Sequence, residues 1–153
     1  MVIATERLDL HPFTVELASA IVAGDAAGRH WIEGFPREDD QDAAGMFLKL
    51  PGDTYCSYTI VDRGSGQTVG TIGFFGPPDE RGAVMVGYGL AEAARGYGYA
   101  TEALRGLMAF AFAQPEVTRI LADADLDNFA SHRVLEKAGF TRVTPGQWVH
   151  ERG

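Results

Sequence analysis

The segment Arg95-Gly96-Tyr97-Gly98-Tyr99-Ala100 separates a β-forming run that ends at Leu90 from the most regular helical pattern of the chain. The apolar residues of that pattern recur at helical spacing on one face: Leu104, Leu107, Met108 and Ala111. A strand, a glycine-rich turn and a helix N-terminus together aim unpaired backbone N–H groups at one point, which favours an anion. The pattern predicts a pyrophosphate site, with an ordinary glycine-rich turn as the alternative.

Two common nucleotide-binding motifs do not fit this segment. The dinucleotide fingerprint G-x-G-x-x-G follows the first strand of its fold, whereas this loop follows the fourth expected strand, and Thr101 stands where the third glycine would be. The phosphate-loop motif G-x-x-x-x-G-K-[ST] does not occur in the chain. The sequence therefore argues against a dehydrogenase and against an ATPase.

Strand-like and helical patterns alternate on both sides of the segment. The expected strands cover residues 5–13, 55–61, 69–75, 83–90, 117–124 and 140–143, with a short return through Trp148. The expected helices cover residues 14–24, 42–50, 98–113 and 127–138. The three strands between residues 55 and 90 read as an antiparallel meander, and the order β-α-α-β-β-β-α-β-α-β-β indicates an α/β fold.

Composition limits the classes of function. The chain has 153 residues, 46% of them apolar, which suits one domain over residues 1–153. Its net charge of -8 argues against nucleic acids and acidic membranes as partners, and either attracts cationic substrates such as amines or keeps the protein in solution. The lone cysteine, Cys56, forms no internal disulfide, and neither a signal peptide nor a membrane span is evident. We therefore expect a cytoplasmic protein.

Several segments together resemble a known family. They are Gly87-Tyr88-Gly89-Leu90, the stretch from Arg95 to Ala103, and the stretch from Asp127 to Phe140 that includes Arg133-Val134-Leu135-Glu136-Lys137-Ala138-Gly139. They resemble the GNAT superfamily of acetyl-CoA-dependent N-acetyltransferases. The opening residues 5–13 are similar to the RimJ/RimL-like branch, whose members acetylate ribosomal proteins. The resemblance implies a mixed, mostly antiparallel central sheet with helices on both faces.

The resemblance also implies acetyl-CoA as co-substrate and assigns its binding residues. The family pattern [RQ]-x-x-G-x-[GA] would hold the pyrophosphate on the loop backbone, and the end of the preceding strand would pair with the pantetheine arm. A backbone N–H of that strand would polarise the thioester carbonyl. Asn128 would contact the pantetheine with Ser131 beside it, and capping of the helix is the other use of Asn128. The expected cofactor-binding residues are Tyr88, Gly89, Leu90, Arg95, Gly96, Tyr97, Gly98, Tyr99, Ala100, Thr101, Asn128 and Ser131.

The sequence departs from the family at the usual acid and base. Leu135 stands where many members carry the tyrosine that protonates the departing thiolate, and Met85 stands where many of this branch carry a glutamate. The hydroxyls expected near the thioester are those of Tyr88 and Ser131. The candidate bases are Glu33, His30, Asp123 and Asp125, whereas His132 is expected on a solvent-exposed helix face. A peptide α-amine, with a pKa of about 7.7–8.0, needs little help from a base.

An acceptor site is expected in the irregular region after the first helix. Trp31 and Phe35 flank Glu33, and aromatic rings with a carboxylate suit an ammonium group, although local packing is the alternative. We therefore expect transfer of an acetyl group to a primary amine, of a protein N-terminus or a small molecule, by direct attack through a tetrahedral intermediate. The alternative is a catalytically inactive acyl-CoA-binding module. No metal site is indicated by the spacing of His and Cys, and a homodimer is compatible with the sequence.

Overall fold

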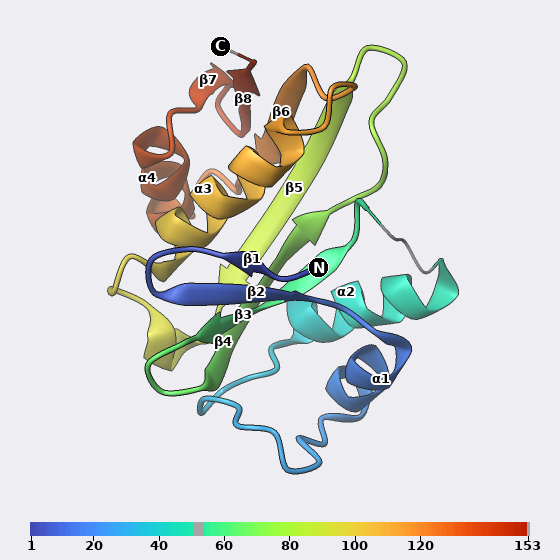
Figure 1. Cartoon of the computed structure of the whole chain (residues 1–153). Coiled ribbons are helices and arrows are strands. Elements are labelled where there is room, and N and C mark those ends of the chain that lie inside the picture. Colours follow the sequence, from blue (N-terminus) through green and yellow to red (C-terminus); the bar gives the residue numbers. More distant parts are fainter. Residues whose placement is uncertain (51–53, 153) are drawn as a thin grey trace.

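The computed structural model describes residues 1–50 and 54–152, which form one mixed sheet with helices packed on it (Figure 1). The strands lie side by side in the order β1-β2-β3-β4-β5-β6-β8-β7. Their bounds are β1 (Ile3–Ala4), β2 (Leu8–Pro12), β3 (Ser57–Asp62), β4 (Gln67–Phe74), β5 (Ala83–Leu90), β6 (Arg119–Asp123), β7 (Thr141–Thr144) and β8 (Gln147–Glu151). Neighbouring strands pair antiparallel except β5 and β6, which are parallel.

The helices form two layers, one on each face of the sheet. They are α1 (Val15–Ala23), α2 (Glu38–Lys49), the 3-10 helix η1 (Glu92–Ala94), α3 (Tyr99–Phe112) and α4 (Phe129–Lys137). Tyr88 of β5 bonds to Ser131 of α4, whereas Thr71, which pairs with the next residue Gly89, bonds to Asp40 of α2. Because successive side chains of a strand point to opposite faces, α2 lies on the face opposite α4.

Each layer has its own apolar core. The larger core lies between the sheet and α3, and it includes Leu8, Leu10, Leu104 and Leu107, each 0% exposed. The smaller one joins α1 and α2 to the end of β5 and consists of Phe13, Ala18, Ile21, Phe35, Ala44 and Ala91. None of the described helices combines the length and the apolar character that a membrane span requires.

The parallel pair of strands at the centre of the sheet separates before β5 ends. The register of β5 with β6 runs from Ala83 opposite Arg119 to Val86 opposite Ala122. On its other side β5 stays paired with β4 up to Leu90. The last residues of β5, 87–90, therefore turn an edge toward β6 that has no strand partner among the described residues. Such an edge can accept an extended ligand.

The sequence-based fold prediction is confirmed, with local differences. The strand at residues 83–90 and the antiparallel meander are observed as expected. The expected strand at residues 5–13 is wrong at its start, because the Arg63 guanidinium donates to the Thr5 and Glu6 carbonyls and holds a turn there, which creates the short β1. Helix α2 begins four residues earlier than residue 42, because the Asp40 carboxylate accepts the Arg37 backbone N–H and caps it.

Candidate functional site

The loop before α3 has the backbone that the glycine pattern predicts. Gly96 and Gly98 have φ of 88° and 79°, in the left-handed region that favours glycine. Gly98 is the N-cap of α3, and no side chain caps this helix. The first N–H groups of α3 therefore stay open toward the loop, at the positive end of the helix dipole. The arrangement suits a phosphate group.

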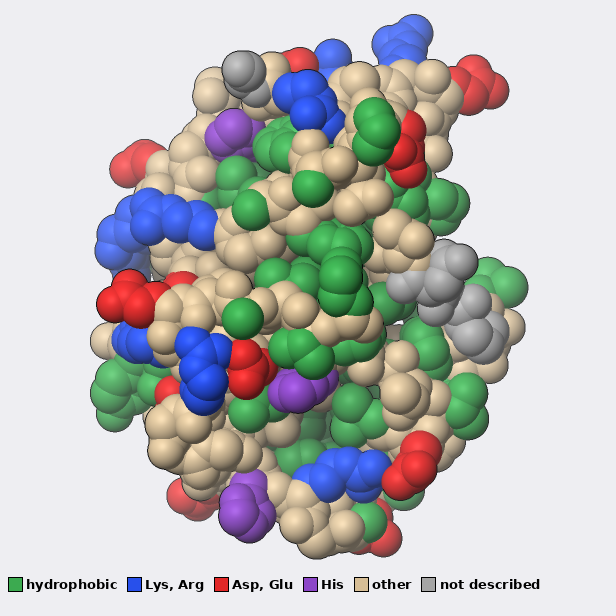
Figure 2. All heavy atoms as spheres, in the orientation of Figure 1, with side chains coloured by type: hydrophobic (Ala, Val, Ile, Leu, Met, Phe, Trp, Pro, Cys, Tyr) green, Lys and Arg blue, Asp and Glu red, His purple; other side chains and the backbone are tan. Residues whose placement is uncertain are grey.

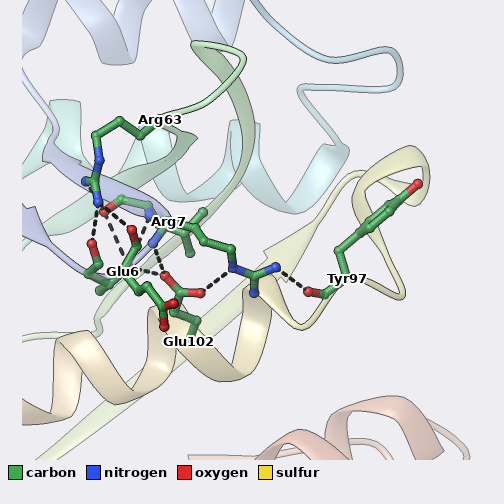
Figure 3. Close-up of polar contacts among 7 residues, drawn as sticks. Glu6, Arg7, Arg63, Tyr97 and Glu102 are labelled. Atoms are coloured by element: carbon green, nitrogen blue, oxygen red, sulfur yellow. Dashed lines mark hydrogen bonds and ion pairs between the residues drawn. The ribbon is translucent and has the colours of Figure 1, made fainter.

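Arg7, which the sequence analysis missed, clamps this loop from the turn between β1 and β2. Its Nη1 donates to the Tyr97 carbonyl over 2.8 Å, and its Nε lies 2.7 Å from Oε1 of Glu102 on α3 (Figure 3). The guanidinium also lies over the ring of Tyr99, 4.8 Å from its centre. The rings of Tyr97 and Tyr99 are stacked, with centres 5.7 Å apart. One side chain thus fixes the loop to the first turn of α3.

The Glu102 carboxylate is the acceptor that joins Arg7 and Thr5 to α3. Its Oε2 accepts hydrogen bonds from the Thr5 hydroxyl and from the backbone N–H of Arg7 over 2.7 Å. Partial burial works to raise the pKa of Glu102, but these bonds and the Arg7 guanidinium together lower it below its usual value. The same contacts raise the pKa of Arg7, chiefly through its bond to Glu102. Arg63 stabilises the turn between β1 and β2 by donating to the backbone carbonyls of Thr5 and Glu6 (Figure 3).

At the free end of β5, the Tyr88 side chain lies against α4. Its hydroxyl is 2.7 Å from the Ser131 hydroxyl and donates to the Ser131 carbonyl over 3.2 Å. Burial raises the pKa of Tyr88 to about 12, although the bond with Ser131 works in the opposite direction. Asn128 caps α4 by accepting the Ser131 N–H over 3.1 Å, which occupies only its Oδ1. Leu135, which stands at the position expected for the family's tyrosine, is 0% exposed.

Two of the three predicted acceptor residues, Trp31 and Phe35, pack together beside the end of β5. The rings of Trp31 and Phe35 meet edge to face with centres 5.2 Å apart, and Phe35 packs in the same core cluster as Ala91. The segment is held by β4, because the Thr68 carbonyl accepts the Ile32 N–H over 3.0 Å. The Trp31 indole N–H is buried without a partner among the described residues. The Glu33 side chain is exposed, whereas Phe35 contributes its ring to packing.

The remaining candidate bases are exposed, and one expectation is wrong. Asp123 and Asp125, at the end of β6, are exposed, and His30 is also exposed. His132 is only 7% exposed, because its Nδ1 accepts the Trp148 indole N–H over 3.0 Å and lies 2.9 Å from Arg142 Nη2. Its Nε2 lies 2.9 Å from the Asp125 carbonyl, so His132 orders the chain between β6 and α4.

Surface charge and metal-ligand geometry add little to the site. On the face shown in Figure 2 the acidic and basic side chains are interspersed, so the net charge of -8 forms no single acidic patch there. Within residues 1–50 and 54–152, no three His, Cys, Asp or Glu side chains gather in an arrangement that could hold a metal ion.

Comparison with known proteins points in one direction. Residues 7–141 match the family described as acetyltransferase (GNAT) domain. The uncharacterized N-acetyltransferase YjdG of Bacillus subtilis is 38% identical over 84 residues, which are 55% of this chain and 50% of that protein. The chain therefore aligns with about half the length of this relative.

Solved structures share the fold over almost the whole chain. A GNAT-family acetyltransferase from Bacillus anthracis superposes with a TM-score of 0.70 at 24% identity, over 97% of this chain and 96% of the other. RimL, a ribosomal L7/L12 alpha-N-protein acetyltransferase in complex with coenzyme A, superposes with a TM-score of 0.73 at 18% identity, over 99% and 98% of the two chains. At these identities the likeness shows a common fold.

Proposed function

Because this chain belongs to the GNAT acetyltransferase family, we propose that it binds acetyl-CoA and transfers the acetyl group to a primary amine. The observation that carries the proposal is the placement of two features at one end of the sheet: a helix N-terminus opened by Gly98, and the unpaired edge of β5 at residues 87–90. The first suits a pyrophosphate and the second an extended amide-containing arm.

The residues present fit acetyl-CoA. At position 98 a left-handed φ of 79° would strain any residue with a Cβ, and that Cβ would lie 3.4 Å from Arg7 Nη2. Because Gly98 has no side chain, a phosphate can approach the backbone there. The loop residues 95–101 would hold the pyrophosphate, and Tyr88, Gly89 and Leu90 would pair with the pantetheine arm. Asn128 and Ser131 would border that arm from α4. Bound acetyl-CoA supplies an activated thioester.

Groups of this chain would position the acceptor, stabilise the negative charge that develops on the carbonyl oxygen, and transfer protons. A backbone N–H of residues 88–90 would donate to the carbonyl oxygen as negative charge develops on it. The Tyr88 hydroxyl, with its raised pKa of about 12, keeps its proton at neutral pH and could pass it to the leaving sulfur, with Ser131 donating to the tyrosine oxygen in return. The carbon–sulfur bond breaks, the carbon–nitrogen bond forms, and the amine loses a proton to water or to a base such as Glu33. Tyr88 would then regain a proton from solvent.

We propose an α-amine as acceptor. A peptide N-terminus, with a pKa of about 7.7–8.0, is partly neutral at pH 7, so the lack of an acidic side chain at Met85 matters less than it would for a lysine. The name of the fold neighbour RimL, an alpha-N-protein acetyltransferase, supports the same class. We also propose a cytoplasmic location, which the single cysteine supports because no internal disulfide can form.

The test is calorimetric titration of the protein with acetyl-CoA, with NAD and ATP as controls, followed by measurement of thiol release in the presence of peptide amines and polyamines. Selective binding with amine-dependent thiol release is the expected result. Binding without thiol release for any amine at any pH would identify an inactive acyl-CoA-binding module, which Leu135 in place of the family's tyrosine would explain. The absence of acetyl-CoA binding would overturn the proposal altogether.

A further inference from the structure

The face of β5 that looks toward α2 has two positions without side chains, and other residues fill the space. A Cβ at Gly87 would lie 2.8 Å from the Phe75 ring. A Cβ at Gly89 would lie 2.1 Å from Nη2 of Arg37 and 2.5 Å from its Cζ. The Arg37 guanidinium therefore lies directly against the backbone of Gly89, one residue from Tyr88 and on the opposite face of the sheet.

Arg37 is held rigidly by one edge of its guanidinium group. Its Nε and Nη2 donate to the two oxygens of Asp40 over 3.2 and 2.8 Å. The Asp40 carboxylate is 0% exposed and also accepts the Thr71 hydroxyl and the backbone N–H of Arg37. A buried carboxylate with this many partners orients the arginine as a fixed fork.

The other edge of the fork carries Nη1, which also borders the strand, since a Cβ at Gly89 would lie 2.5 Å from it. Among the described residues, the carboxylate that Nη1 meets is that of Asp39, at 4.0 Å, and Asp39 is 84% exposed. The Arg37 side chain itself keeps 24% of its surface exposed. Beside it, the Phe75 side chain is 71% exposed although it packs on Gly87. An oriented guanidinium, whose Nη1 has no hydrogen-bond acceptor among the described residues, thus stands beside an accessible ring at the end of β5.

A buried ion pair such as that of Arg37 and Asp40 contributes little stability compared with apolar side chains of similar size. A role in binding would explain why this ion pair is kept in place of apolar side chains, because Arg37 can present hydrogen-bond donors to a ligand. An acceptor placed on the side of Gly87 and Gly89 would lie beside Arg37 and Phe75, across the strand from Ser131 of α4. There it would meet the free N–H groups of Arg37, which bind oxygen atoms and repel cations.

We propose that Arg37 selects an acceptor in which the reacting amine sits on the carbon next to a carbonyl or carboxylate group. The amino terminus of a peptide and a free amino acid share this chemistry, whereas a polyamine lacks the oxygen and brings a second positive charge. The inference rests on the proposed acetyl transfer and assigns the oxygen of the acceptor to the outer edge of the Arg37 fork.

The test compares three acceptors: a peptide with a free N-terminus and an amidated C-terminus, a free amino acid, and spermidine. Wild-type protein should favour the oxygen-bearing acceptors in kcat/KM, and the peptide and the amino acid arms show which of the two sources is used. In the double variant R37Q/D40N, which avoids an unpaired buried charge, KM for the oxygen-bearing acceptor should rise by about tenfold or more. The kcat/KM ratio of that acceptor to spermidine should fall by a similar factor.

Three controls separate the possible failures. Arg37→Lys keeps the charge beside Asp40 but loses the fork, and it should also raise KM. Arg119→Gln removes a cation from an ion pair with Glu151. Arg119 lies opposite Ala83 at the start of β5, away from residues 87–90, so this variant should leave the kcat/KM ratio of the two acceptors unchanged. Calorimetry should give the double variant the acetyl-CoA affinity of the wild type. Preference of the wild type for spermidine, or an equal loss on all acceptors, would overturn the role of Arg37, whereas loss of acetyl-CoA binding in the wild type would overturn the proposed function instead.

Discussion

The hydroxyl of Tyr88 lies 2.7 Å from the hydroxyl of Ser131, although the two residues are 43 positions apart in the sequence. The bond joins the free end of β5 to the first turn of α4. It places a phenol beside the strand edge proposed to bind the thioester, in a chain that has Leu135 rather than a tyrosine further along the same helix. The proposed proton donor is therefore supplied by the sheet instead of by the helix.

Replacing Tyr88 by Phe should lower kcat by about 100-fold or more, the usual effect of removing a positioned proton donor, and leave acetyl-CoA affinity close to that of the wild type. Steady-state kinetics with calorimetry separate the two quantities. Ser131→Ala, which removes only the partner hydroxyl, should have a smaller effect on kcat. An unchanged kcat in Tyr88→Phe would exclude the tyrosine as the acid.

The pH profile of the wild type follows from the same pKa. Because the folded pKa of Tyr88 is raised to about 12, its proton is retained throughout the range in which the acceptor amine titrates. The rate should therefore rise with pH through the pKa of the amine, about 7.7–8.0 for a peptide, and stay level above it. A decline that begins near pH 9 would show that another group provides the proton.

Gly98→Glu should abolish measurable acetyl-CoA binding, because it adds a carboxylate and a strained backbone where the phosphates would lie. Gly28→Glu is a matched control, since Gly28 also has a left-handed φ, of 86°, and a Cβ there would meet no atom within 4 Å. The control should bind as the wild type does. Equal affinities for wild type and Gly98→Glu would place the pyrophosphate site elsewhere.

Glu102 should make the stability of the protein depend on acid pH. Its folded pKa is lowered, so its contribution is complete above the unfolded pKa of about 4.5 and is lost as pH falls through the folded value. Glu102→Gln should be less stable than wild type at pH 7, by roughly 1–3 kcal/mol, and the difference should shrink below about pH 4. Urea unfolding at several pH values measures this, and a difference that stays constant with pH would contradict the assignment.

His132→Phe should destabilise the protein by roughly 1–3 kcal/mol, because it leaves the buried Trp148 indole N–H without its acceptor. Urea unfolding followed by tryptophan fluorescence reports this loss. Nitrogen NMR on the wild type should show the proton of the ring on Nε2, since Nδ1 accepts the indole N–H and Nε2 faces the Asp125 carbonyl. A proton on Nδ1 would contradict this hydrogen-bond scheme.

Local signals were sufficient to predict most elements of the fold. The residues spaced for a buried helix face, Leu104, Leu107, Met108 and Ala111, are all at most 8% exposed. Thr14 and Gly24 cap α1 as their residue types suggest, and Gly98 opens α3. Each of these predictions depends on residues within a few positions of one another, where spacing and propensity carry the information.

Contacts between distant segments were missed for the opposite reason. Arg7 meets Glu102 across 95 positions, and the guanidinium of Arg37 lies against Gly89 on another element. Nothing near Arg7 or Arg37 in the sequence distinguishes them from ordinary surface arginines. His132 was expected in solvent because its partners, Trp148 and Arg142, belong to strands that follow it. The glycines at 87 and 89 were the available signal, since they marked where another group approaches the strand.

The clamp made by Arg7 bears on how this protein is handled in the laboratory. A shortened version that starts at Leu8 would retain β2 and its pairing with β3, yet it would lose the side chain that ties Tyr97 to α3. Such a protein would lose the contact that holds the loop proposed to bind the pyrophosphate, although no loop residue had been altered. A fusion partner or affinity tag is therefore better attached at the other terminus, beyond β8, than ahead of this turn.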